Sequence, residues 1–211
     1  MKKIIIGLVA LLSFSSPAYA QDATPTPSAN INRFTLSLAQ AMMAAQADAG
    51  DNIIASPYNA LMALGMAGAG AQGTTQAEFN KVLFGGQPAE FSANAAGLTQ
   101  FNGQLLQNAA GKVDLLSANS IWVNRTVATL KPAFDSAMQK NFAAKINDED
   151  FSDPAVPAKI NGWASENTKG LITKVIEKLN GDDAMVLSSA LYFKGVWSEK
   201  FDKKAFPMNL F

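Results

Sequence analysis

The 211-residue sequence contains no cysteine and no histidine. Without cysteine there can be no disulfide, thiol nucleophile, cysteine-based metal site or lipobox-type lipid attachment. Without histidine the Ser-His-Asp and Cys-His arrangements and the usual zinc motifs are excluded, because all of them need imidazole. Stability therefore has to come from core packing, and the commonest hydrolase chemistries are ruled out for this chain.

Routes to catalysis that need no histidine find little support either. No Ser-x-x-Lys spacing occurs in the sequence. The acidic cluster Asp148, Glu149 and Asp150 is typical of a solvated turn rather than of a metal or acid/base site. The glycines between Gly65 and Gly73 lie in an apolar Ala/Met run, which favours close helix packing over phosphate binding. We therefore predict that the chain is not an enzyme and has no cofactor, catalytic residue or metal site.

The N-terminus has the pattern of an export signal. Lys2 and Lys3 precede an apolar run, Ile4–Leu12, and Ala18-Tyr19-Ala20 is a small-x-small cleavage site. A transmembrane anchor is the alternative, but this run is too short to span a bilayer. We predict a signal peptide over residues 1–20, cleavage after Ala20, and a secreted or periplasmic product with no membrane association after cleavage.

Charge gives no sign of a polyanionic partner. The 17 basic residues equal the 17 acidic ones, and cleavage of the signal would remove Lys2 and Lys3. The mature chain would then be slightly acidic, so neither nucleic acid nor an anionic membrane is expected as a partner.

After the signal, a Thr/Pro-rich linker is predicted over residues 21–31, because Thr24–Ser28 offers no core-forming residue. The domain is expected to cover 32–211. Asn52–Ala55 has the composition of a short strand, and Ser56-Pro57 is a strong helix start. The helix that follows is apolar nearly all round, which is typical of a helix buried beneath a sheet.

Extended segments become frequent in the second half of the chain. Residues 113–123, 145–151 and 184–193 favour strands, and the last is apolar on both faces, which predicts a central strand. Helices are expected after Pro132 and around Ile160, with Gly170 as a C-cap. Because helices come first and no βαβ rhythm occurs, we predict a single α+β domain.

Three segments together resemble the serpin family of serine protease inhibitors. The first, Asn52–Thr75, holds the family's strand, buried helix and Gly-Ala-x-Gly-x-Thr turn. The second, Ile160–Ile172, matches the family's helix across the main sheet, and the third, Met185–Trp197, matches its most recognisable strand. The resemblance runs from about Asn32 to Phe211, covers only the family's N-terminal half, and suggests a bacterial secreted member. It implies a serpin-like fold in which N-terminal helices pack on part of a large central β-sheet, here as an incomplete, truncated domain.

The resemblance also implies that most of the matching residues are scaffold. Trp163, Phe193 and Trp197 are expected as core aromatics, and Lys194-Gly195 as a strand exit. The scaffold set is Asn161, Trp163, Thr168, Gly170, Phe193, Lys194, Gly195 and Trp197.

The function that the resemblance implies is inhibition of a serine or cysteine endopeptidase. In serpins a bait loop near the C-terminus is cut and then inserts as a new strand into the main sheet. This sequence does not contain that loop, through which the target protease would bind. A non-inhibitory serpin-like binding protein or chaperone, or an inactive fragment, is the alternative. The missing half is expected to leave the edge of the 184–193 strand unpaired, with association or a molten state as the result.

One departure from the family pattern concerns a polar latch that controls opening of the sheet. Serpins usually carry serine one helical turn after the Ser-Pro start and asparagine on the facing strand. Here the latch positions hold Ser56, Asn59 and Ser189, so a serine and an asparagine have traded places. The two changes are either a compensated latch, with the same donors and acceptors, or independent substitutions.

Overall fold

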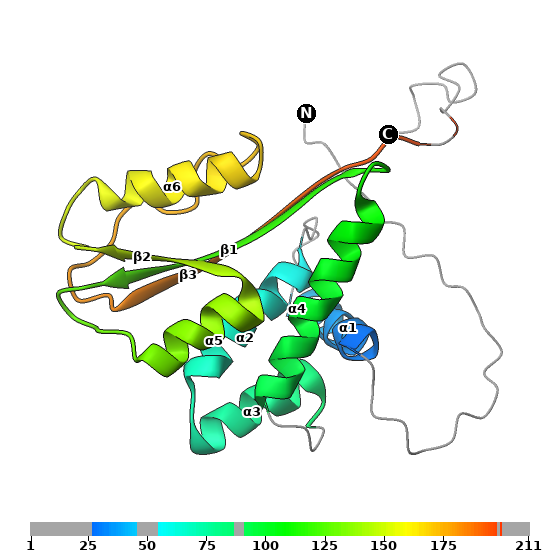
Figure 1. Ribbon diagram of the computed structural model, residues 1–211, viewed down its shortest axis with the longest axis horizontal. Helices are drawn as coiled ribbons and strands as arrows, with labels where there is room; N and C mark the ends of the chain where they lie inside the picture. Colours follow the sequence, from blue (N-terminus) through cyan, green and yellow to red (C-terminus); the bar gives the residue numbers. More distant parts are fainter. Residues whose placement is uncertain (1–26, 46–54, 87–90, 198, 200–211) are drawn as a thin grey trace.

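The computed structural model describes residues 27–45, 55–86, 91–197 and 199. It consists of a group of helices packed against one face of a three-stranded sheet, with a further helix on the opposite face (Figure 1). The predicted signal peptide, residues 52–54 of the predicted first strand, and the end of the chain from residue 200 lie outside the described residues. No described helix combines the length and apolar character needed to cross a bilayer.

Among the described helices, α1 to α5 lie on one side of the sheet and α6 lies on the other side (Figure 1). Their bounds are α1 Pro27–Ala45, α2 Pro57–Gly70, α3 Gly73–Phe84, α4 Phe91–Ala109, α5 Pro132–Phe142 and α6 Val156–Asn167. Helix α1 begins inside the segment expected as a linker, five residues before the expected start of the domain. Proline is well tolerated in a first helical turn, and Asn30 and Ile31 are already buried at 7% and 8% exposure. The helix therefore starts where core contacts begin.

The strands are β1 Asp114–Asn124, β2 Ala144–Glu149 and β3 Met185–Lys194, in the order β2-β1-β3. β1 runs parallel to β2 and antiparallel to β3. The prediction that residues 184–193 form a central strand is wrong for the described part of the chain, where β1 is central and β3 lies at an edge. β3 is apolar on both faces because α2 and α6 cover them, which is a different condition from having two hydrogen-bonded neighbours.

The main core lies between α2 and the sheet. Leu61, Met62 and Met66 of α2 are at most 1% exposed. Gly68 allows α2 to approach its neighbours closely, since a Cβ there would lie 2.6 Å from Cζ of Phe91. Gly68, Gly70 and Gly73 have the spacing of a dinucleotide fingerprint, but Gly68 and Gly70 lie in the last turn of α2 and Gly73 begins α3, whereas the fingerprint needs a turn between a strand and a helix. The packing interpretation therefore stays in place.

A second, smaller core lies under α6. It joins Val156 and Ile160 of α6 to Trp122 of β1 and Phe151, all at most 5% exposed. The predicted α+β class, with helices packed on part of a sheet, is confirmed.

Candidate functional site at the open edge of strand β3

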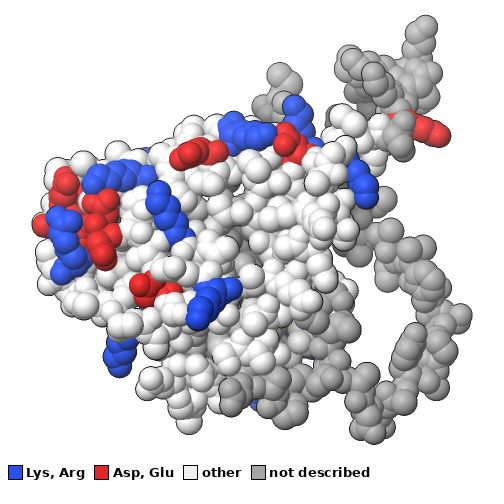
Figure 2. Space-filling view, in the orientation of Figure 1, with Lys and Arg blue, Asp and Glu red and all other residues white. Residues whose placement is uncertain are grey.

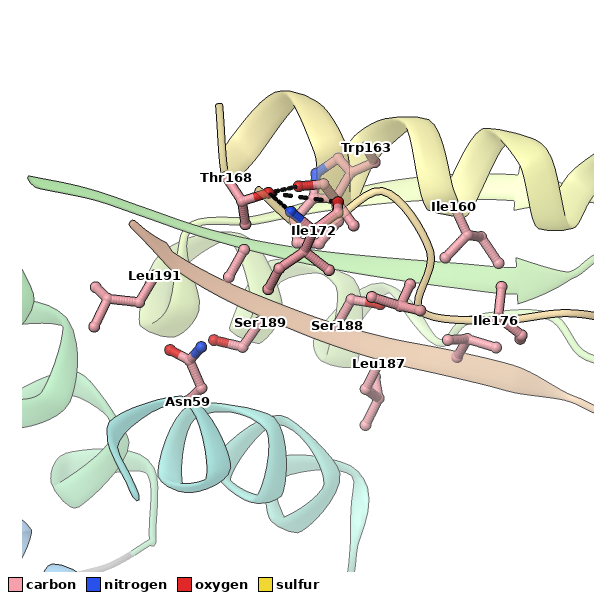
Figure 3. Close-up of a pocket in the computed structure, with 14 residues that line it drawn as sticks. Asn59, Ile160, Trp163, Thr168, Ile172, Ile176, Leu187, Ser188, Ser189 and Leu191 are labelled. Atoms are coloured by element: carbon pink, nitrogen blue, oxygen red, sulfur yellow. Dashed lines mark hydrogen bonds between the residues drawn. The ribbon is translucent and has the colours of Figure 1, made fainter. Parts of the chain in front are cut away.

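The open edge is the side of β3 that faces away from β1, with which no strand pairs among the described residues. A cavity of about 320 Å³ lies along it, between α2 on one side and α6 with the strap on the other (Figure 3). The strap is the segment 168–184 that returns from α6 to β3. Asn59, Trp163, Ile172 and Ser189 are among the residues that line this cavity.

The first turn of α2 sets the position of Asn59. Ser56 is the N-cap in extended conformation, and its Oγ accepts a hydrogen bond from the Asn59 N–H at 3.4 Å. Pro57 occupies the first turn, where its missing N–H is not needed. The predicted helix start is confirmed. Because the cap holds the backbone of Asn59, the side chain is directed from α2 toward β3 (Figure 3).

Asn59 and Ser189 lie opposite each other across the gap between α2 and β3 (Figure 3). Neither completes the expected latch with a hydrogen bond: Asn59 Oδ1 and Ser189 Oγ are both buried without a partner. Buried polar atoms without partners carry a desolvation cost of about 1–3 kcal/mol each. The structure thus brings the two residues together, while the latch itself stays a prediction.

The neighbouring positions extend this row of polar atoms along the α2 face of the sheet. Ser189 pairs in register with Asn119 of β1, whose Nδ2 donates to the Phe142 carbonyl at 2.8 Å while its Oδ1 has no partner. Burial raises the pKa of Tyr58, an effect that Ser117 partly offsets, although neither hydroxyl has a hydrogen bond of good geometry. Asn119 was not singled out from the sequence, although an asparagine in an apolar strand is a signal that could have found it.

The α6 side of the cavity is built from satisfied hydrogen bonds. Asn161 Oδ1 accepts from the N–H groups of Val175 and Ile176 at 2.7 and 3.0 Å, and its Nδ2 donates to the Ile176 carbonyl at 2.8 Å. Thr168 Oγ1 donates to the Ala164 carbonyl at 2.7 Å and accepts from the Ile172 N–H at 3.0 Å (Figure 3). These two side chains hold the strap over β3.

The end of α6 uses left-handed backbone to turn into the strap. Thr168 is the C-cap, and Lys169 and Gly170 follow with φ of +50° and +80°. The expected C-cap at Gly170 is therefore displaced by two residues. Gly170 still closes the helix, because its N–H donates to the Ser165 carbonyl at 2.8 Å.

Asn124, at the end of β1, was not singled out from the sequence and is fully buried. Its Nδ2 donates to the carbonyls of Gly181 and Asp183 at 2.8 and 3.0 Å, which fixes the strap just before β3. Its Oδ1 accepts from the Thr126 hydroxyl at 2.7 Å. Only the tertiary contact with residues 181–183 distinguishes it from an ordinary turn asparagine.

The comparisons agree on one family. The family model for serpins, described as serine protease inhibitors, matches residues 29–211. The chain belongs to the serpin family. Among curated serpins, Iripin-2 of Ixodes ricinus is 32% identical over 200 residues, which cover 93% of this chain and 49% of that protein. Serpin-ZX of Arabidopsis thaliana is 33% identical over 159 residues, which cover 72% of this chain and 39% of that protein.

Solved serpin structures share the fold. The thermophilic serpin tengpin in its latent state superposes with a TM-score of 0.74 at 27% identity, covering 83% of this chain and 45% of that one. The structure of a loop C-sheet serpin polymer superposes with a TM-score of 0.76 at 25% identity, covering 90% of this chain and 48% of that one. The chain spans about half the length of these relatives or less.

The serpin scaffold residues at the end of β3 are not buried in this chain. Trp163 is half-buried against the small core, but Phe193 and Trp197 are 64% and 74% exposed, so their prediction as core aromatics is wrong here. Within the described residues no helix covers this end of the sheet. Lys194 is the last residue of β3 and Gly195 follows it, so the predicted strand exit is confirmed.

Charged groups near the cavity have structural partners. Lys169 Nζ lies 2.7 Å from Asp114 Oδ2 and 5.0 Å from the centre of the Tyr192 ring. The hydrogen bond to Asp114 raises the pKa of Lys169. This contact fastens the end of α6 to both β1 and β3.

The acidic cluster is also structural, although it does not lie wholly in a turn. Asp148 and Glu149 end β2, and Glu149 forms an ion pair with Lys159 at 2.6 Å. Asp150 shapes the turn that follows, because its Oδ1 accepts from the Ser152 N–H at 3.0 Å and from the Ser152 hydroxyl. These bonds hold the pKa of Asp150 below its usual value.

Proposed function

We propose that this chain supplies the N-terminal half of a serpin-type inhibitor of serine or cysteine endopeptidases. The observation that carries the proposal is the open edge of β3 inside a family whose members are generally protease inhibitors. In this proposal a bait loop, carried by the half of the fold that this chain does not span, inserts as a strand after cleavage. The insertion drags the acylated protease with it and distorts its active site.

The surroundings of β3 suit strand insertion. The cavity beside the edge is lined by α2 below and by Trp163 and Ile172 above (Figure 3). An inserted strand would gain backbone hydrogen bonds from β3 and apolar contacts from both layers, and that gain drives the change of state. The strap is held by side-chain hydrogen bonds rather than by a strand ladder, so it can shift without disrupting the sheet.

The latch is part of the same proposal. Asn59 and Ser189 flank the place where the sheet would open, and both carry buried polar atoms without partners. A small rotation of either side chain would join amide and hydroxyl across the gap. We propose that the pair restrains opening of the sheet, with serine and asparagine exchanged relative to the usual serpin arrangement.

The test is a chimera that joins residues 21–211 to the C-terminal half of an inhibitory serpin. Incubated with a panel of serine and cysteine proteases, it should form a covalent complex that survives denaturing electrophoresis. The matched control replaces a small residue in the hinge of the bait loop by arginine, which should leave loop cleavage intact and abolish the complex. Cleavage without a complex in the unmodified chimera would instead favour the binding protein or chaperone.

Export from a bacterial cell is proposed from Lys2, Lys3 and Ala18-Tyr19-Ala20. The mature protein is proposed to start at Gln21, with a linker before the domain. N-terminal sequencing of exported protein decides this, and recovery of uncleaved chain in the membrane fraction would contradict it.

We also propose that the chain has no hydrolytic activity of its own, since it has neither histidine nor cysteine and no Ser-x-x-Lys spacing. Turnover of a broad peptide library by protein purified to homogeneity would refute this.

A further inference from the structure

The open edge of β3 has a definite pattern of backbone groups. The Asn124 N–H donates to the Ala184 carbonyl at 3.0 Å, so the backbone of residue 184 faces β1. Along an antiparallel strand the backbone groups alternate between the two sides. The residues whose N–H and C=O groups face the open edge are therefore Met185, Leu187, Ser189, Leu191 and Phe193.

The edge lacks the usual features that prevent pairing with another chain. No residue from Met185 to Phe193 is charged or proline, and β3 has no bulge in its register with β1. Charges lie only at the two ends, with Asp182 and Asp183 before the strand and Lys194 at its last position. The two ends of the edge are thus opposite in sign.

We propose that β3 pairs antiparallel with β3 of a second copy of this chain, with the two-fold axis at Ser189. This register places Leu187 opposite Leu191 of the second copy, and Met185 opposite Phe193 of the second copy. The two sheets become one continuous six-stranded sheet. The proposal concerns the 211-residue chain by itself and does not depend on the proposed function.

Two observations favour this arrangement: the Ser189 side chain selects the register, and the charged ends select the antiparallel direction. The buried Ser189 hydroxyl, which has no partner within one copy, meets Ser189 of the second copy across the axis, and one hydroxyl can donate to the other. Lys194 lies opposite Ala184 of the second copy, next to the turn of that copy that carries Asp182 and Asp183, so opposite charges meet at each end of the shared strand pair. Moving the axis to Leu187 or Leu191 loses the Ser189 pairing, and a parallel arrangement puts like charges together.

The strap supplies apolar surface beside the same edge. Ile172 and Val175 line the edge cavity and are 47% and 54% exposed. Pairing of two copies brings these side chains toward their counterparts. Burial of such apolar surface adds to the backbone hydrogen bonds of the shared strand pair.

The absence of cysteine makes single-cysteine cross-linking a clean test. In the Ser189→Cys variant the two Cα atoms across the axis would be about 5.5 Å apart, within the range of a disulfide. The matched control is Phe193→Cys on the same edge. Phe193 is 64% exposed and therefore accessible. In the proposed register, however, the Phe193 Cα atoms of the two copies would be eight residues apart along the strand, roughly 27 Å.

Under mild oxidation of the full chain, Ser189→Cys should form a disulfide dimer at least about tenfold faster than Phe193→Cys, because geometry rather than exposure decides the rate. An equal mixture of Met185→Cys and Phe193→Cys chains should cross-link as the mixed dimer only. Cross-linking of Phe193→Cys as fast as Ser189→Cys would show random association and overturn the register.

Solution measurements on the unmodified chain complete the test. Sedimentation velocity should give a dimer at micromolar concentration, and Lys194→Glu should raise the dimer dissociation constant by about threefold to tenfold. The double variant Asp182→Lys with Lys194→Glu should return it to the original value. A monomer at tens of micromolar, or a double variant weaker than Lys194→Glu alone, overturns the proposal.

Discussion

The two faces of the sheet are held in different ways. On the α2 face apolar side chains and glycines pack closely, and the polar atoms of Asn59, Asn119 and Ser189 include some without partners. On the α6 face, Asn161 and Thr168 hold the strap by satisfied hydrogen bonds to its backbone. The α2 face therefore combines a large apolar core with a polar row that is only partly hydrogen-bonded, while the α6 face combines a smaller apolar core with a strap held by side-chain hydrogen bonds.

Charge follows the same division. Only Arg33, Glu78 and Lys81 are charged in α1 to α4. Figure 2 shows most of the charged side chains over α6 and the adjoining end of the sheet, while much of the surface over the lower helices is uncharged. The layer of α1 to α4 therefore depends on apolar burial, whereas charged side chains cover much of the α6 side.

The largest expected effect is on the α2 face. Leu61 is fully buried, and Leu61→Ala should lower the free energy of unfolding by about 3 kcal/mol through lost burial and a residual cavity. Leu36→Ala is the control, since Leu36 is 60% exposed, and its effect should stay within about 0.5 kcal/mol. Thermal unfolding at fixed protein concentration measures both, and equal effects would contradict the assigned core.

A smaller and local effect is expected on the α6 face. Asn161→Ala removes three hydrogen bonds to the strap and should loosen it by about 2 kcal/mol without unfolding the α2 core. Hydrogen exchange should quicken in residues 171–180 alone. Asn167→Ala is the control, because Asn167 donates only within α6, to the Trp163 carbonyl; a strap that exchanges equally fast in this variant would refute the role of Asn161.

The latch joins the α2 layer to the edge of the sheet, and a double-mutant cycle measures it. Asn59→Ser and Ser189→Asn should each destabilise the fold, and the double variant should recover about 1 kcal/mol relative to their sum if the pair is compensated. Thermal unfolding of the four proteins gives the coupling. Strict additivity would support the independent substitutions instead.

The smallest effect concerns the exposed ion pair between Lys169 and Asp114. Because the folded state raises the pKa of Lys169, the stabilisation is fully present below the ordinary lysine pKa and is lost as pH rises through the raised value. The difference in Tm between the unmodified chain and Lys169→Met should therefore shrink in strongly alkaline solution. Lys178→Met controls for the loss of a surface charge. A Tm difference between the unmodified chain and Lys169→Met that grows with pH would contradict the stabilising role of the ion pair.

Local patterns in the sequence were enough to place several elements. Ser56-Pro57 predicted the start of α2, the all-round apolar pattern predicted its burial, and Pro132 predicted α5, since caps and periodicity act within a few residues. The resemblance to serpins came from three separated motifs in order, and the family match over residues 29–211 agrees with it.

The tertiary structure decided what depends on contacts between distant segments. Asn124 is buried and hydrogen-bonded to the strap only because residues 181–183 pack against it. β3 is an edge strand among the described residues, although both its faces are covered. Phe193 and Trp197 are large aromatic residues of the kind usually found in a core, yet their exposure depends on which elements lie over the end of the sheet. By itself the sequence determined helix caps, apolar faces and family, because these are local or additive signals. Strand order, burial at the edge and the meeting of Asn59 with Ser189 required the folded chain, because each depends on neighbours far away in the sequence.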